Sequence, residues 1–515
     1  MERYQSAWGI KTDLEICLEQ LQSGNQIYPF TLGTQDICDR FQIPEKLYGR
    51  KKEVNQLLST FERVSQSHTE MILVSGFSGI GKSALVNEVQ KPIVSQRGYF
   101  ISGKFDQLKR DIPYAAFSQA FQELIQQLLT ESEPLVQSWR EKIIEILGMN
   151  SQVIIDVIPE LEKIIGKQPS VPQLEPAEAQ NQFNFFFPRF INIFSTTIHP
   201  LVIFLDDLQW ADLPSLKLIE LLMTDSDSKH LLLIGAYRDN EVSSVHPLIQ
   251  TLEKINKLEG KVSKITLYPL ANKPINQLIK ETLKCSTECS QPLAKLLNNK
   301  TKGNPFFLTQ LLQSLYKDNF LYFDRSEMCW KWNIEEIKEI DITDNVVDLM
   351  IAKIEKLDDD TQKILKLAAC IGNRFNLEIL SCVNDKSQAA TSRELQLALQ
   401  EGLILPLSTD YKIPLFWNQE DINVSAPTSN VKLESANYPK SITYKFLHDR
   451  VQQAAYTLIS ENDKKQLHLK VANLLLENTL EEELEENIFD IVNQFNEGLE
   501  LISEQSDKNK GSDSN

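Results

Sequence analysis

The chain has 515 residues, of which 42% are hydrophobic, and a formal net charge of -18. This length allows about three domains with substantial cores, and the net acidity argues against non-specific binding to nucleic acid, which needs an excess of Lys and Arg. No apolar run reaches the length of a membrane span and the N-terminus lacks a signal-peptide pattern, so we expect a cytoplasmic protein that does not bind membranes.

Residues 1–20 have the apolar spacing of an amphipathic helix, and residues 21–46 have the composition of a linker. The region 47–270 alternates short apolar runs with helical patterns, which predicts an α/β core with a parallel sheet covered on both faces. Within this core the long segment 108–200 has helical spacing and is expected to add a layer of helices. The predicted strands are residues 71–74, 99–102, 201–205, 231–236 and 265–267.

The first predicted strand leads into a sequence of the form G-x-x-x-x-G-K-[ST], which is the phosphate-binding loop of nucleotide-binding proteins. Its glycines let the backbone N–H groups curl around a phosphate, and the following helix adds a partial positive charge. Lys82 is expected to reach the β- and γ-phosphates, and the Ser83 hydroxyl to ligate Mg²⁺. The predicted nucleotide-binding residues of this loop are Gly76, Gly79, Gly81, Lys82 and Ser83.

Two carboxylates, Asp206 and Asp207, follow the buried strand predicted at residues 201–205. Ligands of open α/β sheets bind at the carboxyl ends of the strands. We therefore predict that Asp206 orders the Mg²⁺ shell through water and that Asp207 polarises the attacking water. The alternative is an ordinary acidic turn after a buried strand.

Arg238 follows the strand predicted at residues 231–236. At this edge of the sheet an arginine can read a γ-phosphate or stabilise the charge that develops during phosphoryl transfer. The alternative is an ion pair with Asp239 or Glu241.

The order of these motifs, followed by Lys302-Gly303-Asn304-Pro305-Phe306-Phe307, resembles the STAND class of signalling ATPases, which are relatives of AAA+ proteins. The likeness covers about residues 47–460 and is strongest to the ATPase module of cyanobacterial-type multi-domain serine/threonine or histidine kinases. The resemblance implies ATP or ADP and Mg²⁺ as ligands, a helical lid at 271–345 and a winged-helix domain at 346–460. It also implies that Gly49 and Arg50 help to hold the adenine and that Pro305 of the lid lies near the base.

The sequence Leu447-His448-Asp449-Arg450-Val451 resembles the Met-His-Asp element of apoptotic and plant immune ATPases. This resemblance implies that His448 contacts the phosphate of ADP and holds a resting state. The alternative is that His448 caps or packs the start of a helix.

The two ends of the chain suggest a link to a kinase. Residues 1–20 resemble the last helix of a protein-kinase lobe, although the chain has no kinase catalytic motif. The alternative is a plain amphipathic helix. Residues 461–502 resemble the start of a helical-repeat region, and residues 503–515 are expected to form a disordered tail. We therefore expect a protein kinase or other signalling domain as partner, in the same polypeptide or as a neighbouring gene product.

The favoured function is a slowly hydrolysing signalling ATPase that acts as a nucleotide-dependent regulatory switch, and the resemblance also allows an ATP-dependent homo-oligomer. A scaffold that binds ATP without turnover is the alternative. An origin-recognition-type DNA-binding ATPase is less favoured because of the net charge of -18.

Overall fold

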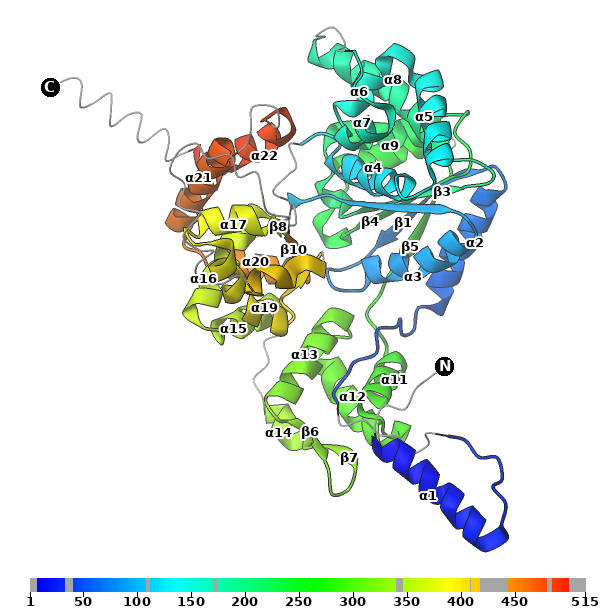
Figure 1. Ribbon diagram of the computed structural model, residues 1–515, viewed down its shortest axis with the longest axis vertical. Coiled ribbons are helices and arrows are strands. Elements are labelled where there is room, and N and C mark those ends of the chain that lie inside the picture. The colour runs from blue at the N-terminus through cyan, green and yellow to red at the C-terminus, as the bar shows by residue number, and fades with distance from the viewer. Residues whose placement is uncertain are drawn as a thin grey trace, which may run out of the picture. The chain divides into compact units, whose positions relative to one another are not determined.

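The structure, a computed structural model, describes residues 7–32, 40–107, 112–169, 175–258, 260–339, 346–407, 409–416, 442–478 and 484–499 (Figure 1). The chain divides into two compact units, which are described separately. Unit 1 consists of Met1–Glu62, Val74–Gln96 and Lys264–Asp344, and unit 2 consists of Arg63–Leu73, Arg97–Ser263 and Asn345–Asn515. No helix within the described ranges is both long and apolar enough to cross a membrane.

A five-stranded sheet has the order β2-β3-β4-β1-β5, and β3 pairs in parallel with β2 and with β4. Every residue of β4 is buried, as is every residue of β3 except its last, which explains the continuous apolar runs in the sequence. The predicted α/β class with a parallel sheet is confirmed. The strands are β1 (Thr69–Ser75), β2 (Tyr99–Lys104), β3 (Leu201–Asp206), β4 (Leu231–Tyr237) and β5 (Val262–Thr266).

The expected helical layer is present between β2 and β3, and its helices α5 to α8 lie together in the upper part of Figure 1. Phe187, Phe190 and Phe194 of α8 are fully buried and share one hydrophobic core with β2, β3 and β4. The helices of this part of unit 2 are α4 (Ala115–Leu128), α5 (Glu133–Leu147), α6 (Ser151–Ile155), α7 (Glu162–Ile165), α8 (Pro176–Phe194), α9 (Leu213–Thr224) and α10 (Pro247–Lys257).

The approach of β2 to α4 leaves no room for a side chain at Gly103, where an added Cβ would lie 1.8 Å from the carbonyl oxygen of Ala116. We expect Gly103→Ala to lower the free energy of unfolding by about 3 kcal/mol, because the backbone of α4 has to move. Urea denaturation measures the effect. Gly24→Ala is the control, since no heavy atom lies within 4 Å of its added Cβ. Equal stability of the two variants would contradict the close packing.

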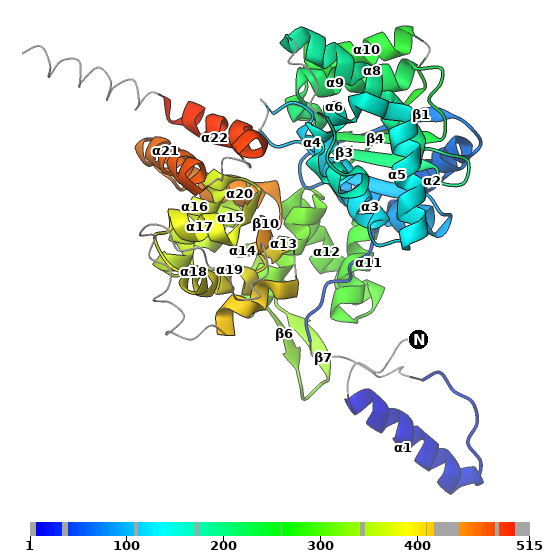
Figure 2. The same ribbon diagram turned by 45° about the horizontal axis from the view of Figure 1, so that its top comes forward.

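Unit 1 contains a helical segment after β5 with a hydrophobic core of its own, to which Ile279, Leu297 and Leu311 contribute. Strands β6 and β7 pair in antiparallel fashion and form a hairpin (Figure 2). Helix α1 continues four residues beyond the predicted end at residue 20 and stops at Gly24, where the next residue, Asn25, has a left-handed backbone with φ of 56°. The elements are α1 (Ala7–Gly24), α2 (Lys51–Ser65), α3 (Lys82–Ser95), α11 (Asn272–Leu283), α12 (Thr287–Thr301), α13 (Pro305–Lys317), β6 (Leu321–Asp324), β7 (Cys329–Trp332) and α14 (Ile334–Glu339).

The last part of unit 2 combines helices with a three-stranded antiparallel sheet of order β8-β10-β9. Assignment of residues 346–460 to a winged helix stays a prediction, and the tail predicted at 503–515 lies outside the described residues. The elements are α15 (Val346–Glu355), α16 (Asp359–Ile371), β8 (Arg374–Asn376), α17 (Leu377–Val383), α18 (Gln388–Glu394), α19 (Gln396–Gln400), β9 (Ile404–Pro406), β10 (Thr443–Phe446), α20 (Asp449–Thr457), α21 (Glu461–Asn478) and α22 (Leu484–Glu497).

Candidate functional site

The predicted phosphate loop connects β1 to α3 in the manner that its sequence indicates. Gly76, Gly79 and Gly81 have φ angles of 149°, 74° and 96°, in the region that glycine adopts without strain. Gly81 is the N-cap of α3 and no side chain caps this helix. The local backbone therefore has the curled form and the helix N-terminus that bind phosphate in proteins.

Lys82, the first residue of α3, is buried against this loop. Its Nζ donates hydrogen bonds to the carbonyl oxygens of Gly76, at 3.0 Å, and Phe77, at 3.1 Å. Ser83 follows as the second residue of the helix. The ammonium group is thus held by the loop itself, and its contact with the phosphates of a nucleotide stays a prediction.

Arg50 connects the phosphate loop with the segment after β5, and Gly49 packs against the start of α11. The Arg50 guanidinium donates to the carbonyl oxygen of Tyr268 at 2.6 Å and to that of Ile80 at 3.4 Å. A Cβ at Gly49 would lie 2.6 Å from the ring of Pro274. These contacts give the pair a structural role within unit 1, and their contact with adenine stays a prediction.

The start of α13, in the segment predicted to form the lid, contacts the phosphate loop directly. Asn304 caps α13 by accepting from Phe307 N at 3.1 Å, and its Nδ2 donates to the carbonyl oxygen of Ser78 at 2.9 Å. The backbone N–H of Phe306 donates to the carbonyl oxygen of Gly79 at 3.2 Å. Pro305 therefore lies at the first turn of a helix whose N-terminus contacts the loop. Asn304 was not among the predicted site residues, although an Asn before Pro is a helix-start signal.

In unit 2, the ends of three neighbouring strands bring charged side chains to one edge. Lys104 ends β2 and is in register with Asp206, which ends β3, and Arg238 directly follows β4. Asp207 comes next after Asp206 and has a left-handed backbone with φ of 56°. The predicted residues Asp206, Asp207 and Arg238 are therefore at the carboxyl edge of the sheet, together with Lys104, which the sequence analysis did not select.

Asp207 is buried among charged and polar partners. One carboxylate oxygen lies 3.3 Å from Lys104 Nζ, and the other lies 3.4 Å from Arg238 Nε and accepts from Gln209 Nε2 at 2.8 Å. Burial raises the pKa of Asp207, and the carboxylates of Asp206 and Asp449 add to the increase, while the two cations oppose it. The role of Asp207 in polarising water stays a prediction.

Arg238 is only 6% exposed and is held by three carboxylates. Its guanidinium lies 2.6 Å from Asp449, 2.9 Å from Glu241 and 3.4 Å from Asp207. The ion pair with Glu241 that the sequence allowed is therefore present. The guanidinium also lies over the Trp210 ring, 4.5 Å from its centroid.

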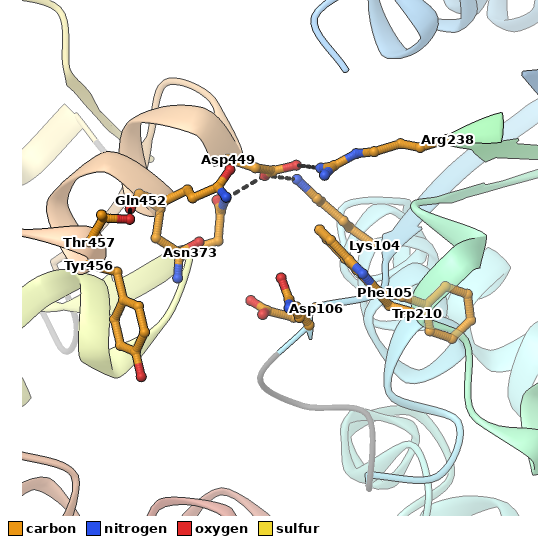
Figure 3. A pocket seen from close by; sticks show the side chains of 12 residues that line it. Lys104, Phe105, Asp106, Trp210, Arg238, Asn373, Asp449, Gln452, Tyr456 and Thr457 are labelled. Atoms are coloured by element: carbon orange, nitrogen blue, oxygen red, sulfur yellow. Dashed lines mark hydrogen bonds and ion pairs between the residues drawn. The ribbon is translucent and has the colours of Figure 1, made fainter. Parts of the chain in front are cut away.

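Asp449, the first residue of α20, contacts the edge of the sheet in unit 2 (Figure 3). Its carboxylate pairs with both Arg238 and Lys104 and also accepts a hydrogen bond from Asn373 Nδ2 at 2.7 Å. Burial alone would raise the pKa of Asp449, but the cations Lys104 and Arg238 hold it well below its usual range. Asp449 stands beside His448 in the sequence motif, and the motif by itself predicted no role for it.

His448 is the N-cap of α20, and its Nδ1 accepts a hydrogen bond from the backbone N–H of Arg450 at 3.1 Å. The capping alternative from the sequence is therefore correct, and contact of His448 with a nucleotide stays a prediction. Burial lowers the pKa of His448 to about 4, with a contribution from nearby cations. The ring is thus neutral near pH 7, and because Nδ1 is an acceptor, Nε2 carries the proton and is a donor.

This capping geometry predicts a pH effect on stability. Between its unfolded pKa of 6.5 and its folded pKa of about 4, His448 takes up a proton only in the unfolded chain. The stabilisation is therefore fully present above pH 6.5 and declines as the pH falls toward 4. We expect His448→Asn, which keeps a capping side chain without the titration, to lose less stability than the wild type over this range. Parallel pH profiles in urea denaturation would contradict this prediction.

Comparison with protein families supports the nucleotide-binding interpretation. Residues 46–234 match the family model of the AAA ATPase domain. The matched range includes the phosphate loop, Asp206 and Asp207, and the predicted P-loop ATPase is thereby confirmed.

The chain is similar to several histidine kinases. It is 31% identical to hybrid signal transduction histidine kinase G of Dictyostelium discoideum, over 98% of this chain and 18% of that protein. It is 22% identical to the peroxide stress-activated histidine kinase mak3 of Schizosaccharomyces pombe, over 79% of this chain and 21% of that protein. The chain thus spans about a fifth of the length of these relatives.

Among solved structures, the chain is similar to a signal transduction ATPase with numerous domains from Pyrococcus horikoshii, which carries a tetratricopeptide repeat sensor. The TM-score is 0.43 and the sequence identity 13%, over 90% of this chain and 49% of that chain.

Proposed function

We propose that this chain, whose residues 46–234 form an AAA ATPase domain, is a STAND-type signalling ATPase of the cytoplasm. It binds ATP or ADP with Mg²⁺, hydrolyses ATP slowly and regulates a kinase in the same polypeptide or a separate kinase. The similarity to histidine kinases supports this partner class.

The observation that carries the proposed switch is the pairing of Asp449 with Arg238 at 2.6 Å. The Arg238 guanidinium cannot form its full set of hydrogen bonds with Asp449 and with a γ-phosphate at the same time, because the two anions compete for the same N–H donors. We therefore assign the Asp449-bound arrangement to the closed form, in which ADP is bound. In the open form Arg238 contacts the γ-phosphate of ATP and Asp449 is released.

The other site residues have defined parts in this scheme. Lys82 and the backbone of the phosphate loop bind the phosphates. Mg²⁺ bound to a nucleotide needs only one or two protein ligands, and the donor set of Ser83 and Asp206 fits this requirement. The described residues contain no group of three or more His, Cys, Asp or Glu side chains that would form a metal site independent of nucleotide. In the closed form the neutral His448 donates through Nε2 to a phosphate of ADP.

Hydrogen exchange tests the proposed switch. In the 515-residue chain, saturating ADP should protect the amides of α20, and a saturating non-hydrolysable ATP analogue should expose them. The same exchange pattern with both nucleotides would refute the switch, even if both nucleotides bind tightly.

A scaffold that binds ATP without turnover is the second candidate, favoured by the engagement of Asp207 with two cations and Gln209. Turnover separates the two functions. If Asp207 polarises water, Asp207→Asn should reduce phosphate release by at least about 100-fold. Unaltered phosphate release from this variant would favour the scaffold.

A further inference from the structure

Four side chains in unit 2 form a closed ring of alternating charge, which we call the ion-pair ring. Its members are Lys104, Asp207, Arg238 and Asp449. Each carboxylate contacts both cations. Asp207 lies 3.3 Å from Lys104 and 3.4 Å from Arg238. Asp449 pairs with the same two side chains, as Figure 3 shows. The ring thus joins three strand ends of the sheet to the first residue of α20.

We infer that Lys104 is a positioning residue of the switch. Lys104 holds Asp449 independently of Arg238 and thereby sets the stability of the closed form. This inference rests on the proposed function and adds a second cation to it.

The two cations of the ring contact different oxygen atoms of Asp449. Oδ1 of Asp449 pairs with Lys104 and Oδ2 pairs with Arg238. Loss of one cation therefore leaves the other contact geometrically possible. When a γ-phosphate engages Arg238, Lys104 still attracts Asp449. Release of Asp449 therefore requires that ATP binding also overcome the ion pair between Lys104 and Asp449.

The backbone of Lys104 is held by α4, and its side chain lies beside a cavity. Its backbone N–H donates to Gln119 Oε1 of α4 at 2.9 Å, which holds the end of β2. Its side chain lines a cavity of about 220 Å³, whose wall also includes Arg238, Trp210, Asn373, Asp449 and Tyr456. Lys104 is 34% exposed and Arg238 only 6%. The lysine is therefore the more accessible of the two contacts with Asp449.

The test is a double-mutant cycle on the nucleotide-free 515-residue chain, read by hydrogen exchange of α20. The cycle uses Lys104→Met, which keeps the length of the side chain without its charge, Asp449→Asn and the double variant. We expect Lys104→Met to reduce protection of α20 about tenfold in the wild-type background, as for a lost charge-assisted hydrogen bond. In the Asp449→Asn background the same substitution should have almost no effect.

Two further variants distinguish positioning from general destabilisation. Lys104→Arg keeps the charge and should restore most of the protection. Lys217→Met is the matched control, because it removes the ion pair of Lys217 with Glu220 at 2.6 Å elsewhere in unit 2, and it should leave α20 unchanged.

The same loss of protection in both Asp449 backgrounds, or no rescue by Lys104→Arg, would overturn the inference. Because this cycle contains no nucleotide, its failure is distinguishable from failure of the proposed switch, which depends on the difference between ADP and ATP. With nucleotide, Lys104→Met should also shift the midpoint of α20 opening to a lower concentration of ATP analogue.

Discussion

Lys82→Ala is expected to weaken ATP binding by at least about 100-fold. The Lys82 ammonium is held over the phosphate loop by the carbonyl oxygens of Gly76 and Phe77, at 3.0 and 3.1 Å. Its loss removes charge-assisted hydrogen bonds to the phosphates, and two such bonds together contribute roughly 3–4 kcal/mol. Isothermal titration calorimetry with ATP and Mg²⁺ measures the change directly.

Lys91→Ala is the matched control, because Lys91 lies in the same helix α3 with an exposed side chain. It should bind ATP with wild-type affinity. Circular dichroism of both variants checks that the helix is kept. If Lys82→Ala bound ATP as tightly as Lys91→Ala did, nucleotide binding at this loop would be refuted, and with it the proposed function.

Asp449→Asn is expected to release the closed form. The substitution keeps the shape of the side chain but removes the charge that pairs with Arg238 at 2.6 Å and with Lys104. Removal of one partner from a largely buried ion pair costs about 3 kcal/mol, because the remaining cations lose their compensation. We therefore expect a lower free energy of unfolding and ADP release at least about tenfold faster than in the wild type.

Stopped-flow displacement of a fluorescent ADP analogue measures the release rate, and urea denaturation measures the stability. The control is Asp385→Asn in the same unit, which removes the contact of Asp385 with Lys470. The Asp385 side chain is 74% exposed, and exposed ion pairs contribute little to stability. Slow ADP release from Asp449→Asn, equal to that from the control, would show that Asp449 does not hold the closed form.

The sequence was sufficient to predict the features that depend on local backbone conformation or on the apolar pattern of the strands. Apolar runs predicted the strands of a parallel sheet, and the structure has them. The glycine pattern of the phosphate loop predicted a turn that the φ angles of Gly76, Gly79 and Gly81 bear out. Because parallel strands end at a common edge, Asp206, Asp207 and Arg238 could also be placed together in advance.

The helix at residues 1–20 and the role of His448 show the limits of local reasoning. The end of α1 was missed by four residues, since the helix ends where Asn25 has a left-handed backbone, and apolar spacing alone does not locate such a residue. For His448 the sequence left capping and nucleotide contact open. The structure shows the cap, and the neutral ring that results still carries a donor at Nε2.

The tertiary structure alone decided which charges meet. Lys104 and Asp449 are 345 residues apart in the chain, and Arg238 and Asp449 are 211 apart. No spacing rule connects such positions, because an ion pair of this kind forms only when separately folded segments pack together. Asn304 contacts Ser78 for the same reason, 226 residues away. The sequence by itself determined the prediction of where phosphate binds, and the packing of distant segments determined which carboxylate holds the cations at the edge of the sheet.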